Sequence, residues 1–261
     1  MLWSPSCLVG YAVPTLQRRS VRPFVKAHRI LSSSAITGLD QLQERVVACR
    51  RCPRLVQYLS DIRAARPDCW CRPVPGFGDP QARILLVGLA PGRFGSNRTG
   101  RMFTGDASGS FLYPALHTMG WASQPNAIEV DDGLQLRSVY ITAVVRCAPP
   151  QNKPLPEEIA RCAPFVTEEL TLLSRLRVVV TLGQIAHQTY LRLRGARVSE
   201  YPFRHGATYR LPGAPVHVVA SYHPSRQNTN TGLLTMPMFL SMFRSVEKLA
   251  GLAERGEERE S

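Results

Sequence analysis

The chain has 261 residues, 44% of them hydrophobic, so it can bury one sizeable core, and no linker divides its middle. It contains no apolar run of about eighteen residues, so we expect no membrane span. The formal net charge is +13, and because the first 39 residues carry five of the positive charges and the last eight carry two Arg and four Glu, the body between them is at +10. A basic body predicts a polyanionic partner, nucleic acid first, although a solvated basic surface without a partner would have the same composition.

Residues 1–38 differ in composition from the rest of the chain. They carry Arg and Ser, scattered hydrophobic residues and no acid, as organelle transit peptides do. A disordered extension and a stretch upstream of the true start codon remain open as alternatives. We set residues 1–38 apart from the fold, together with the charged tail 254–261, so the predicted domain spans residues 39–253.

Apolar periodicity predicts a helix at the start of this domain. Leu39, Leu42 and Val46 fall on one face, and we expect the helix to run into Cys49 and Cys52 and to continue beyond them.

Farther along, strand and helix patterns alternate. Four apolar runs predict strands at Arg83–Val87, Val139–Val145, Val178–Leu182 and Val216–Ala220. Helical patterns lie between and after them, at Phe111–Met119, Pro156–Leu173, Gln184–Leu193 and Met238–Leu249. This alternation predicts an α/β fold, a single domain of three layers (α/β/α) around a central four-stranded parallel sheet. Ligands of such sheets bind at the carboxyl ends of the strands.

The stretch Gly88–Gly109 follows the first predicted strand and has six glycines in twenty-two residues. Glycine permits close backbone approach to a ligand, and N–H groups at the start of a helix suit an anionic or planar group. The stretch lacks the Lys-Ser/Thr ending of a Walker loop and the glycine register of a dinucleotide fingerprint. A different type of site is therefore expected here.

Four motifs in the same order as in one known family identify that type. They are GLAPG at Gly88–Gly92, NRTGRMFTGDASG at Asn97–Gly109, RCAPPQNKP at Arg146–Pro154 and SYHPSRQNT at Ser221–Thr229. Together they resemble the iron–sulfur uracil-DNA glycosylases, in particular the B-type enzymes of family five, over about residues 39–252. The resemblance implies the fold of that superfamily.

The resemblance also implies a function. The family is expected to flip out and hydrolytically excise uracil, and other deaminated bases such as hypoxanthine, from DNA. We accordingly expect a monofunctional DNA N-glycosylase of base excision repair that acts on DNA as a monomer. Its expected location is the bacterial cytoplasm, at the nucleoid, or a mitochondrion or other organelle if the N-terminal extension is a targeting sequence.

Seven cysteines without a signal peptide favour metal ligands or free thiols over disulfides. Cys49 and Cys52, combined with Cys147 and Cys162, give four thiolates, a number that suits zinc or a four-iron cluster. Their spacing resembles that of the family's cluster ligands, which implies a 4Fe-4S cluster, with zinc as the alternative. Two further cysteines, Cys69 and Cys71, lie outside this pattern, and Cys7 lies in the extension.

The resemblance assigns chemistry to a few side chains. Phe103 matches the stacking aromatic, with a core residue as the alternative; its Gly-rich polar setting favours exposure in a pocket. His223 matches the donor to the departing base, where a preorganised hydrogen bond counts most. Asp106 and Asn152 match the groups that hold water and stabilise the sugar cation, and Asp106 is also suited to cap a helix. Ala90 stands where other branches of the superfamily have a carboxylate or amide, and it can do no acid–base work.

Other matched positions are expected to contact the substrate rather than react. The residues expected to bind it are Gly88, Ala90, Pro91, Gly92, Phe103, Ser225 and Arg226. The segment around Ser225 and Arg226 resembles the loop that such enzymes insert into DNA. Arg98 and Arg101 join Arg226 as candidate phosphate contacts, although each could be a solvated charge. His117 and His187 fall in helical patterns and are expected to be structural.

Two other functions use the same features. A non-catalytic iron–sulfur protein that binds nucleic acid would keep the cysteines and the basic charge, but it would not need Asp106, Asn152 and His223. A nucleotide-binding transferase would use the glycine-rich stretch, but the chain lacks a P-loop Lys and a pair of carboxylates to bind a metal ion.

Overall fold

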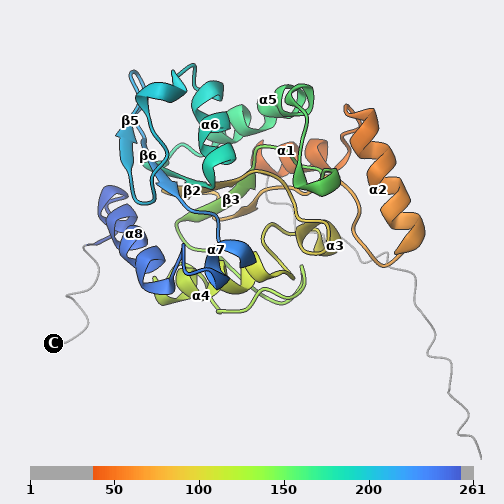
Figure 1. Ribbon diagram of the computed structural model, residues 1–261, viewed down its shortest axis with the longest axis horizontal. Helices are drawn as coiled ribbons and strands as arrows, with labels where there is room; N and C mark the ends of the chain where they lie inside the picture. The colour runs from red at the N-terminus through yellow and green to blue at the C-terminus, as the bar shows by residue number, and fades with distance from the viewer. Residues whose placement is uncertain (1–37, 254–261) are drawn as a thin grey trace, which may run out of the picture. The chain divides into compact units, whose positions relative to one another are not determined.

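A six-stranded sheet forms the centre of the computed structural model, which describes residues 38–253 (Figure 1). Its strand order is β1-β3-β2-β4-β6-β5. The strands are β1 (Phe77–Gly78), β2 (Ile84–Gly88), β3 (Val139–Ala143), β4 (Val178–Leu182), β5 (Thr208–Arg210) and β6 (His217–Ser221). The expectations for the residues before Gly38 and for the tail 254–261 concern parts of the chain outside the described residues.

The four central strands, β3, β2, β4 and β6, pair in parallel. Every residue of β2, β3 and β4 is buried, as expected of parallel strands covered on both faces. The prediction of a four-stranded parallel core is confirmed. The sheet is nevertheless wider than predicted, because β1 pairs antiparallel with β3 and β5 pairs antiparallel with β6, one at each edge.

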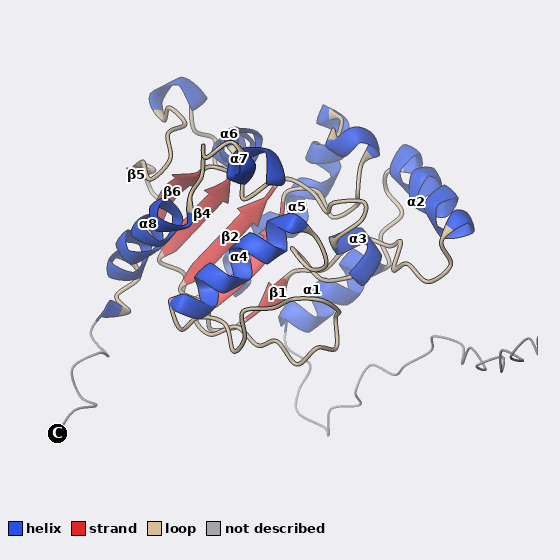
Figure 2. Ribbon diagram, turned by 60° about the horizontal axis from the view of Figure 1, so that its bottom comes forward, coloured by secondary structure: helices blue, strands red, loops and turns tan. Residues whose placement is uncertain are grey.

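Helices cover both faces of the sheet, which confirms the three layers. In Figure 2, α4 and α8 lie over one face, and α1, α5 and α6 lie behind the other. The helices are α1 (Gly38–Val47), α2 (Pro53–Ala65), α3 (Ser96–Thr99), α4 (Ala107–Thr118), α5 (Pro156–Leu172), α6 (Gln184–Leu193), α7 (Arg226–Asn230) and α8 (Met236–Leu249), with 3-10 turns η1 (Pro150–Asn152) and η2 (Val198–Glu200). No helix between residues 38 and 253 has the length and apolar character needed to cross a bilayer.

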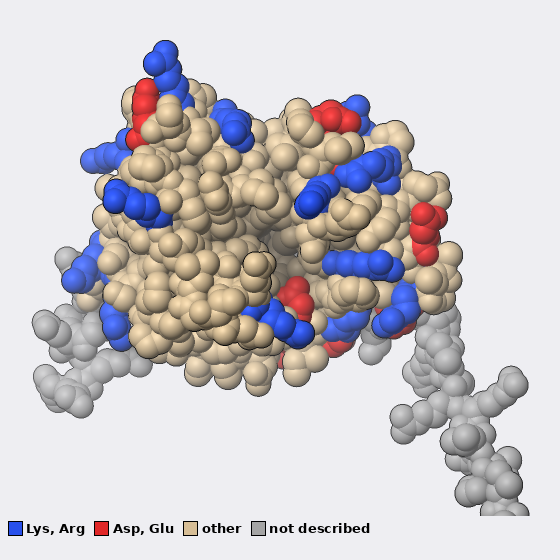
Figure 3. All heavy atoms as spheres, viewed as in Figure 1, with Lys and Arg blue, Asp and Glu red and all other residues tan. Residues whose placement is uncertain are grey.

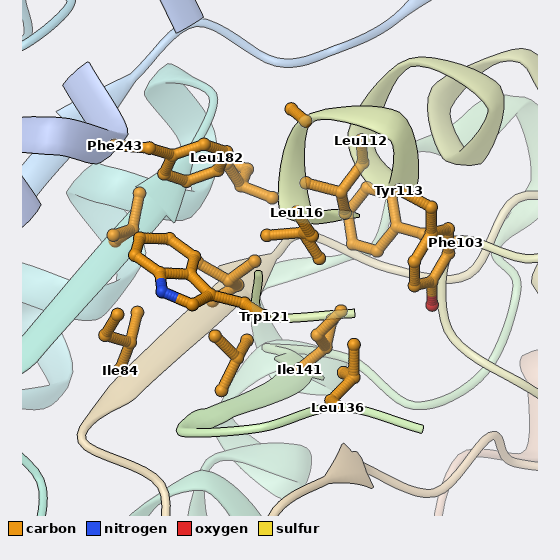
Figure 4. Close-up of a cluster of buried hydrophobic side chains, with 14 of the residues drawn as sticks. Ile84, Phe103, Leu112, Tyr113, Leu116, Trp121, Leu136, Ile141, Leu182 and Phe243 are labelled. Carbon is orange, nitrogen blue, oxygen red and sulfur yellow. The ribbon is translucent and has the colours of Figure 1, made fainter. Parts of the chain in front are cut away.

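Two hydrophobic cores, one on each face, follow from the alternation of side chains along the strands. Ile84 of β2 packs in the core under α4 and α8, where Leu112 and Phe243 also lie (Figure 4). Its neighbour Leu85 points to the opposite core, with Leu42 of α1.

The predicted continuous N-terminal helix is wrong: it breaks between Val47 and Pro53, and Cys49 and Cys52 lie in the break. Pro53 is the first residue of α2, where a missing N–H costs nothing, whereas inside a longer helix it would remove a hydrogen bond. The break frees the two cysteines from helical geometry.

The order of the strands determines where a site forms. From β2, the next strand in the chain, β3, is added on one side, whereas the following strand, β4, is added on the other side of β2. The strand order therefore changes direction at β2. Crevices form at the carboxyl ends of the strands at such a point. In Figure 2 the arrowheads of β2, β4 and β6 point toward the edge where α7 lies.

Candidate active site

Asp106 is the N-cap of α4, as the sequence allowed. Its backbone is extended and its Oδ1 accepts a hydrogen bond from the N–H of Gly109 at 3.0 Å. Burial raises the pKa of this carboxyl, while the N–H groups of Gly109 and Ser108 and the Arg98 guanidinium act to lower it. The carboxylate is therefore partly removed from water, and the hydrogen bonds and the nearby Arg98 charge offset part of the cost of burying its negative charge.

The other carboxylate oxygen faces the loop that follows β2. A β-carbon at Gly95 would overlap Asp106 Oδ2, and one at Gly92 would lie 3.1 Å from the same atom. These two positions accept glycine because the carboxylate occupies the space. The first and second halves of the Gly88–Gly109 stretch thus pack against each other through Asp106.

Phe103 lies in the same stretch, with its backbone in the left-handed region at φ 54°. Its ring is only 8% exposed and belongs to the core in Figure 4, so the expectation of an exposed ring is wrong. One edge of the ring nevertheless reaches the site, because a β-carbon at Gly88 would lie 3.2 Å from Phe103 Cζ. A positive φ is uncommon for a bulky residue, so the surrounding structure must hold the backbone of Phe103 in this conformation.

His223 lies just beyond the carboxyl end of β6, and its ring packs against that of Phe103. It follows β6, and its ring centroid lies 5.9 Å from that of Phe103 with the planes inclined by 33°. Within residues 38–253 its imidazole makes no hydrogen bond, while its carbonyl accepts one from Asn228 Nδ2 at 2.9 Å. Burial lowers the pKa of His223 to about 4, so the ring is neutral near pH 7 and has a donor available for a ligand.

Asn152 is the last residue of the turn η1, in the segment between β3 and α5. It is exposed, and both Asn152 and Gln151 are in the left-handed region, at φ 57° and 54°. Within the described chain, its side chain makes no hydrogen bond, so none joins Asn152 to Asp106 or His223. Two consecutive residues in the left-handed region, of which Asn adopts it readily, leave Asn152 exposed in the segment that follows β3.

The remaining predicted substrate contacts lie along the rim. Ala90 is half-buried and Pro91 is buried, directly after β2. Ser225 and Arg226 do not form a loop as expected: Ser225 is the N-cap of the short helix α7, and the exposed Arg226 is its first residue. The face seen in Figure 1 is hollowed between α7 and α3, with Lys and Arg side chains around the hollow (Figure 3).

Arg101 cannot contact a phosphate as predicted, because it is buried and already paired. Its guanidinium donates to both carboxylate oxygens of Asp132, at 2.8 and 2.6 Å, and its Nε donates to Thr104 Oγ1 at 2.9 Å. Asp132 also accepts from two backbone N–H groups, and together with the Arg101 guanidinium these contacts lower its pKa to about 2. Arg98 is half-buried and pairs with Glu129 at 2.7 Å.

The structural role expected of His187 is confirmed. Its two ring nitrogens lie 3.0 Å from Thr181 Oγ1 and 3.1 Å from the carbonyl oxygen of Tyr201. His205 is similarly occupied: its Nδ1 accepts from the N–H of Tyr222 at 3.2 Å, so its Nε2 donates to the carbonyl of Met238. His117 is an exposed residue in the last turn of α4.

The four predicted ligand cysteines line one pocket: Cys49 and Cys52 from the break between α1 and α2, Cys147 after β3, and Cys162 in α5. Burial raises the pKa of Cys147 and Cys162, and the neighbouring thiols add to the rise. Among residues 38–253, no three His, Cys, Asp or Glu side chains are grouped so that they could hold a metal ion. The structure therefore brings the thiols to one pocket without forming a single-ion site.

Arg146 lies beside this pocket and has donors without acceptors. Its backbone N–H donates to Cys162 Sγ at 3.3 Å, and its Nη2 pairs with Glu169 Oε2 at 2.5 Å. Its Nε and Nη1 are buried and have no hydrogen-bond partner in the described part of the chain. Buried donors without partners are costly, so this position fits an additional acceptor.

Cys69 and Cys71 form a separate small cluster with Ile62. Both are buried, and Cys71 Sγ accepts from Asn97 Nδ2 at 3.6 Å. They do not line the four-cysteine pocket, as the sequence pattern predicted.

Comparison with known proteins identifies the family of the chain. A family model described as the Uracil DNA glycosylase superfamily matches residues 75–247, from before β1 into α8. The chain belongs to this superfamily. The match includes all four motifs, so the membership and α/β fold predicted from them are confirmed.

Within the superfamily, the chain is similar to proteins named type-5 uracil-DNA glycosylase. That of Thermus thermophilus is 57% identical over 214 residues, which are 80% of this chain and 97% of the relative. That of Pyrobaculum aerophilum is 45% identical over 216 residues, 81% of this chain and 93% of the relative. A type-4 uracil-DNA glycosylase of Archaeoglobus fulgidus is 31% identical over 191 residues, 72% of this chain and 82% of the relative.

Proposed function

We propose that this protein is a monofunctional DNA N-glycosylase that flips uracil out of DNA and hydrolyses its N-glycosidic bond. The observation that carries the proposal is the arrangement at the carboxyl edge of the sheet. There Asp106 is packed into the loop after β2, and Phe103 from the same stretch meets His223 from the end of β6. The type-5 relatives, named for this activity, support it.

The chemistry requires a stabilised sugar cation and a stabilised leaving base. The C1′–N1 bond breaks with its electron pair going to uracil, and water adds to C1′ and loses a proton that ultimately neutralises the base. Asp106, desolvated beside Gly92 and Gly95, is the group that stabilises the cation and orients the water, with Asn152 as the second polar candidate. His223, neutral and without a partner among the described residues, donates to the base carbonyl as charge develops there.

The base site is lined by an aromatic ring and by small residues. The edge of Phe103 and the backbone at Gly88, Ala90 and Pro91 provide the surface on which a flipped base packs. Ala90 offers no carboxylate or amide that would read one base. We therefore extend the proposal to other deaminated bases, such as hypoxanthine. Ser225 and Arg226, at the start of α7, fill the gap left in the duplex.

We also propose a 4Fe-4S cluster held by Cys49, Cys52, Cys147 and Cys162. A four-iron cluster takes one thiolate at each iron, so it needs thiols placed around a pocket rather than around one ion. The shared pocket and the two unpaired donors of Arg146 support a sulfur-rich anionic group there. The bound cluster would join α1, α2 and α5 to the segment that carries Asn152, and its role in this proposal is structural.

The decisive experiment is an excision assay on an oligonucleotide with one uracil, in duplex and single-stranded forms. The proposal predicts free uracil and an abasic site, with strand cleavage only after alkali. A folded protein that binds the DNA but releases no base would favour the alternative, a non-catalytic nucleic-acid-binding protein. We expect the protein to be a monomer. We expect it in the compartment that contains its DNA substrate, either the cytoplasm of a bacterium or a DNA-containing organelle.

A further inference from the structure

Among residues 38–253, Phe94 is the large hydrophobic residue with the highest exposed fraction, 70%. It lies in the loop between β2 and α3, two residues after Gly92 and immediately before Gly95. Both glycines pack against the carboxylate of Asp106. An isolated exposed aromatic needs no explanation by itself, but this one borders the group to which the chemistry is assigned.

The backbone around Phe94 is fixed. The carbonyl oxygens of four consecutive residues, 92 to 95, all accept hydrogen bonds from residues of α3. Asn97 donates to Gly92 at 3.0 Å, the Nε of Arg98 donates to Phe94 at 3.2 Å, and the backbone N–H of Arg98 donates to Gly95 at 2.8 Å. The amide of Asn97 completes the set at residue 93. The ring is therefore presented to solvent on a preorganised loop, which lowers the entropic cost of binding.

Positive charge stands beside the ring. The guanidinium of Arg93 lies 5.2 Å from the centre of Phe94 and 5.8 Å from that of Tyr58. The Arg98 guanidinium bonds the Phe94 carbonyl, although Glu129 partly balances its charge. An exposed aromatic next to a cation, on a body at +10, complements a partner that is flat and anionic.

We propose that Phe94 is a stacking platform for an unpaired base of the substrate strand, next to the flipped nucleotide. Consecutive Cα atoms lie about 3.8 Å apart and Gly95 packs against Asp106, so Phe94 stands within reach of the nucleotides that neighbour the reacting sugar. Single-stranded nucleic acid is bound by this combination of aromatic ring and cations. The proposal deepens the proposed function and rests on it, since it names a single-stranded or locally unpaired region as the preferred substrate.

The test uses the full chain and three variants: Phe94→Leu, which keeps apolar bulk, Phe94→Tyr, which keeps the π-face, and Ile128→Ala. Ile128 is a matched control because it is another large apolar side chain, 62% exposed. Its loop is joined to the Gly88–Gly109 stretch through Asp132, which accepts from the N–H of Ile128 and from Arg101. Affinity is measured for oligonucleotides carrying a tetrahydrofuran abasic analogue, single-stranded and duplex, and excision is measured on their uracil counterparts.

Stacking on one base corresponds to about a tenfold change in affinity, within a range of about five- to a hundredfold. Phe94→Leu should weaken single-stranded binding by that factor, with a smaller loss on duplex and an unchanged single-turnover rate at saturating enzyme. Phe94→Tyr should restore the affinity, and Ile128→Ala should stay within about twofold of wild type.

Three results would overturn the inference: unchanged affinity of Phe94→Leu, failure of Phe94→Tyr to restore it, or an equal loss in Ile128→Ala, which would indicate a general apolar docking surface. Equal losses on single-stranded and duplex probes would also contradict it, because paired neighbours are already stacked in the helix. If the wild type releases no uracil, the proposed function fails, yet the binding measurements still decide whether Phe94 stacks on DNA.

Discussion

Replacing Asp106 by alanine separates the two roles of this carboxylate, as helix cap and as partner of the reacting sugar. The change removes the 3.0 Å cap bond to Gly109, and loss of such a cap costs about 1 kcal/mol of unfolding free energy. Because burial already raises the pKa of this carboxyl, removing the charge offsets part of that loss. We expect the melting temperature to fall by about 2–4 °C for a domain of this size.

The effect on the rate should be much larger. If Asp106 stabilises the oxocarbenium ion, Asp106→Ala should slow single-turnover excision by about a hundredfold or more, which is about 2.7 kcal/mol of transition-state stabilisation. Affinity for DNA with an abasic analogue should be almost unchanged, because the interaction forms mainly in the transition state. A cap alone cannot produce this pattern.

Two further variants make the comparison decisive. Asp106→Asn keeps a side chain of similar capping ability and removes the charge, so it should melt near the wild-type temperature and still be slow. Thr235→Ala removes the cap of α8, where the side chain accepts from Met238, and should lose similar stability at full rate. Melting temperature and single-turnover rate are measured on the same samples. A folded Asp106→Ala protein with full activity would refute the reasoning and leave Asn152 to position the water.

Three other predictions test the cluster, the buried ion pair and the histidine. Cys147→Ser should remove the brown colour of protein purified without oxygen and reduce its soluble yield; stoichiometric zinc without iron in the wild type would contradict the cluster. Arg101→Ala should lower the melting temperature by about 10 °C, since it removes the guanidinium from the carboxylate of Asp132, leaves that group only its two backbone N–H donors and costs about 3 kcal/mol; weaker DNA binding at unchanged stability would instead make Arg101 a phosphate contact. The folded pKa of His223 is about 4 against an ordinary 6.5, so the unfolded chain binds more protons between these values, and stability is full above pH 6.5 and falls as the pH drops toward 4. Melting curves across this range should show a shallower fall for His223→Gln, and parallel curves would contradict the assignment.

Sequence patterns predicted the central strands well because burial on both faces leaves an unmistakable apolar run. Val178–Leu182 forms β4 with the predicted bounds, and all five of its residues are buried. The edge strands gave no comparable signal. Phe77–Gly78 has only two residues, and Thr208–Arg210 is exposed at both ends, so neither contains enough residues to display a period.

Local composition was a poor guide to burial inside the glycine-rich stretch. The polar surroundings of Arg101 and Phe103 indicated exposure, yet both are buried. Arg101 can be buried because a partner distant in sequence, the carboxylate of Asp132 31 residues away, neutralises its charge. No periodic pattern encodes such a pair, whereas the candidate site itself was predictable because its motifs follow parallel strands whose carboxyl ends must meet at one edge.

Glycine is favoured at two positions of the Gly88–Gly109 stretch because protein side chains, and not a bound phosphate, occupy the neighbouring space. A glycine-rich turn is usually read as room for a ligand's anionic or planar group. Here the space next to Gly95 is occupied by the protein's own carboxylate, Asp106, and the space next to Gly88 by its own aromatic ring, Phe103. The loop therefore fixes the position of two predicted site residues before any substrate arrives. Electrostatic groups held in advance cost no reorganisation in the transition state, so under the proposed role of Asp106 the glycines at these positions contribute to the preorganisation of the site.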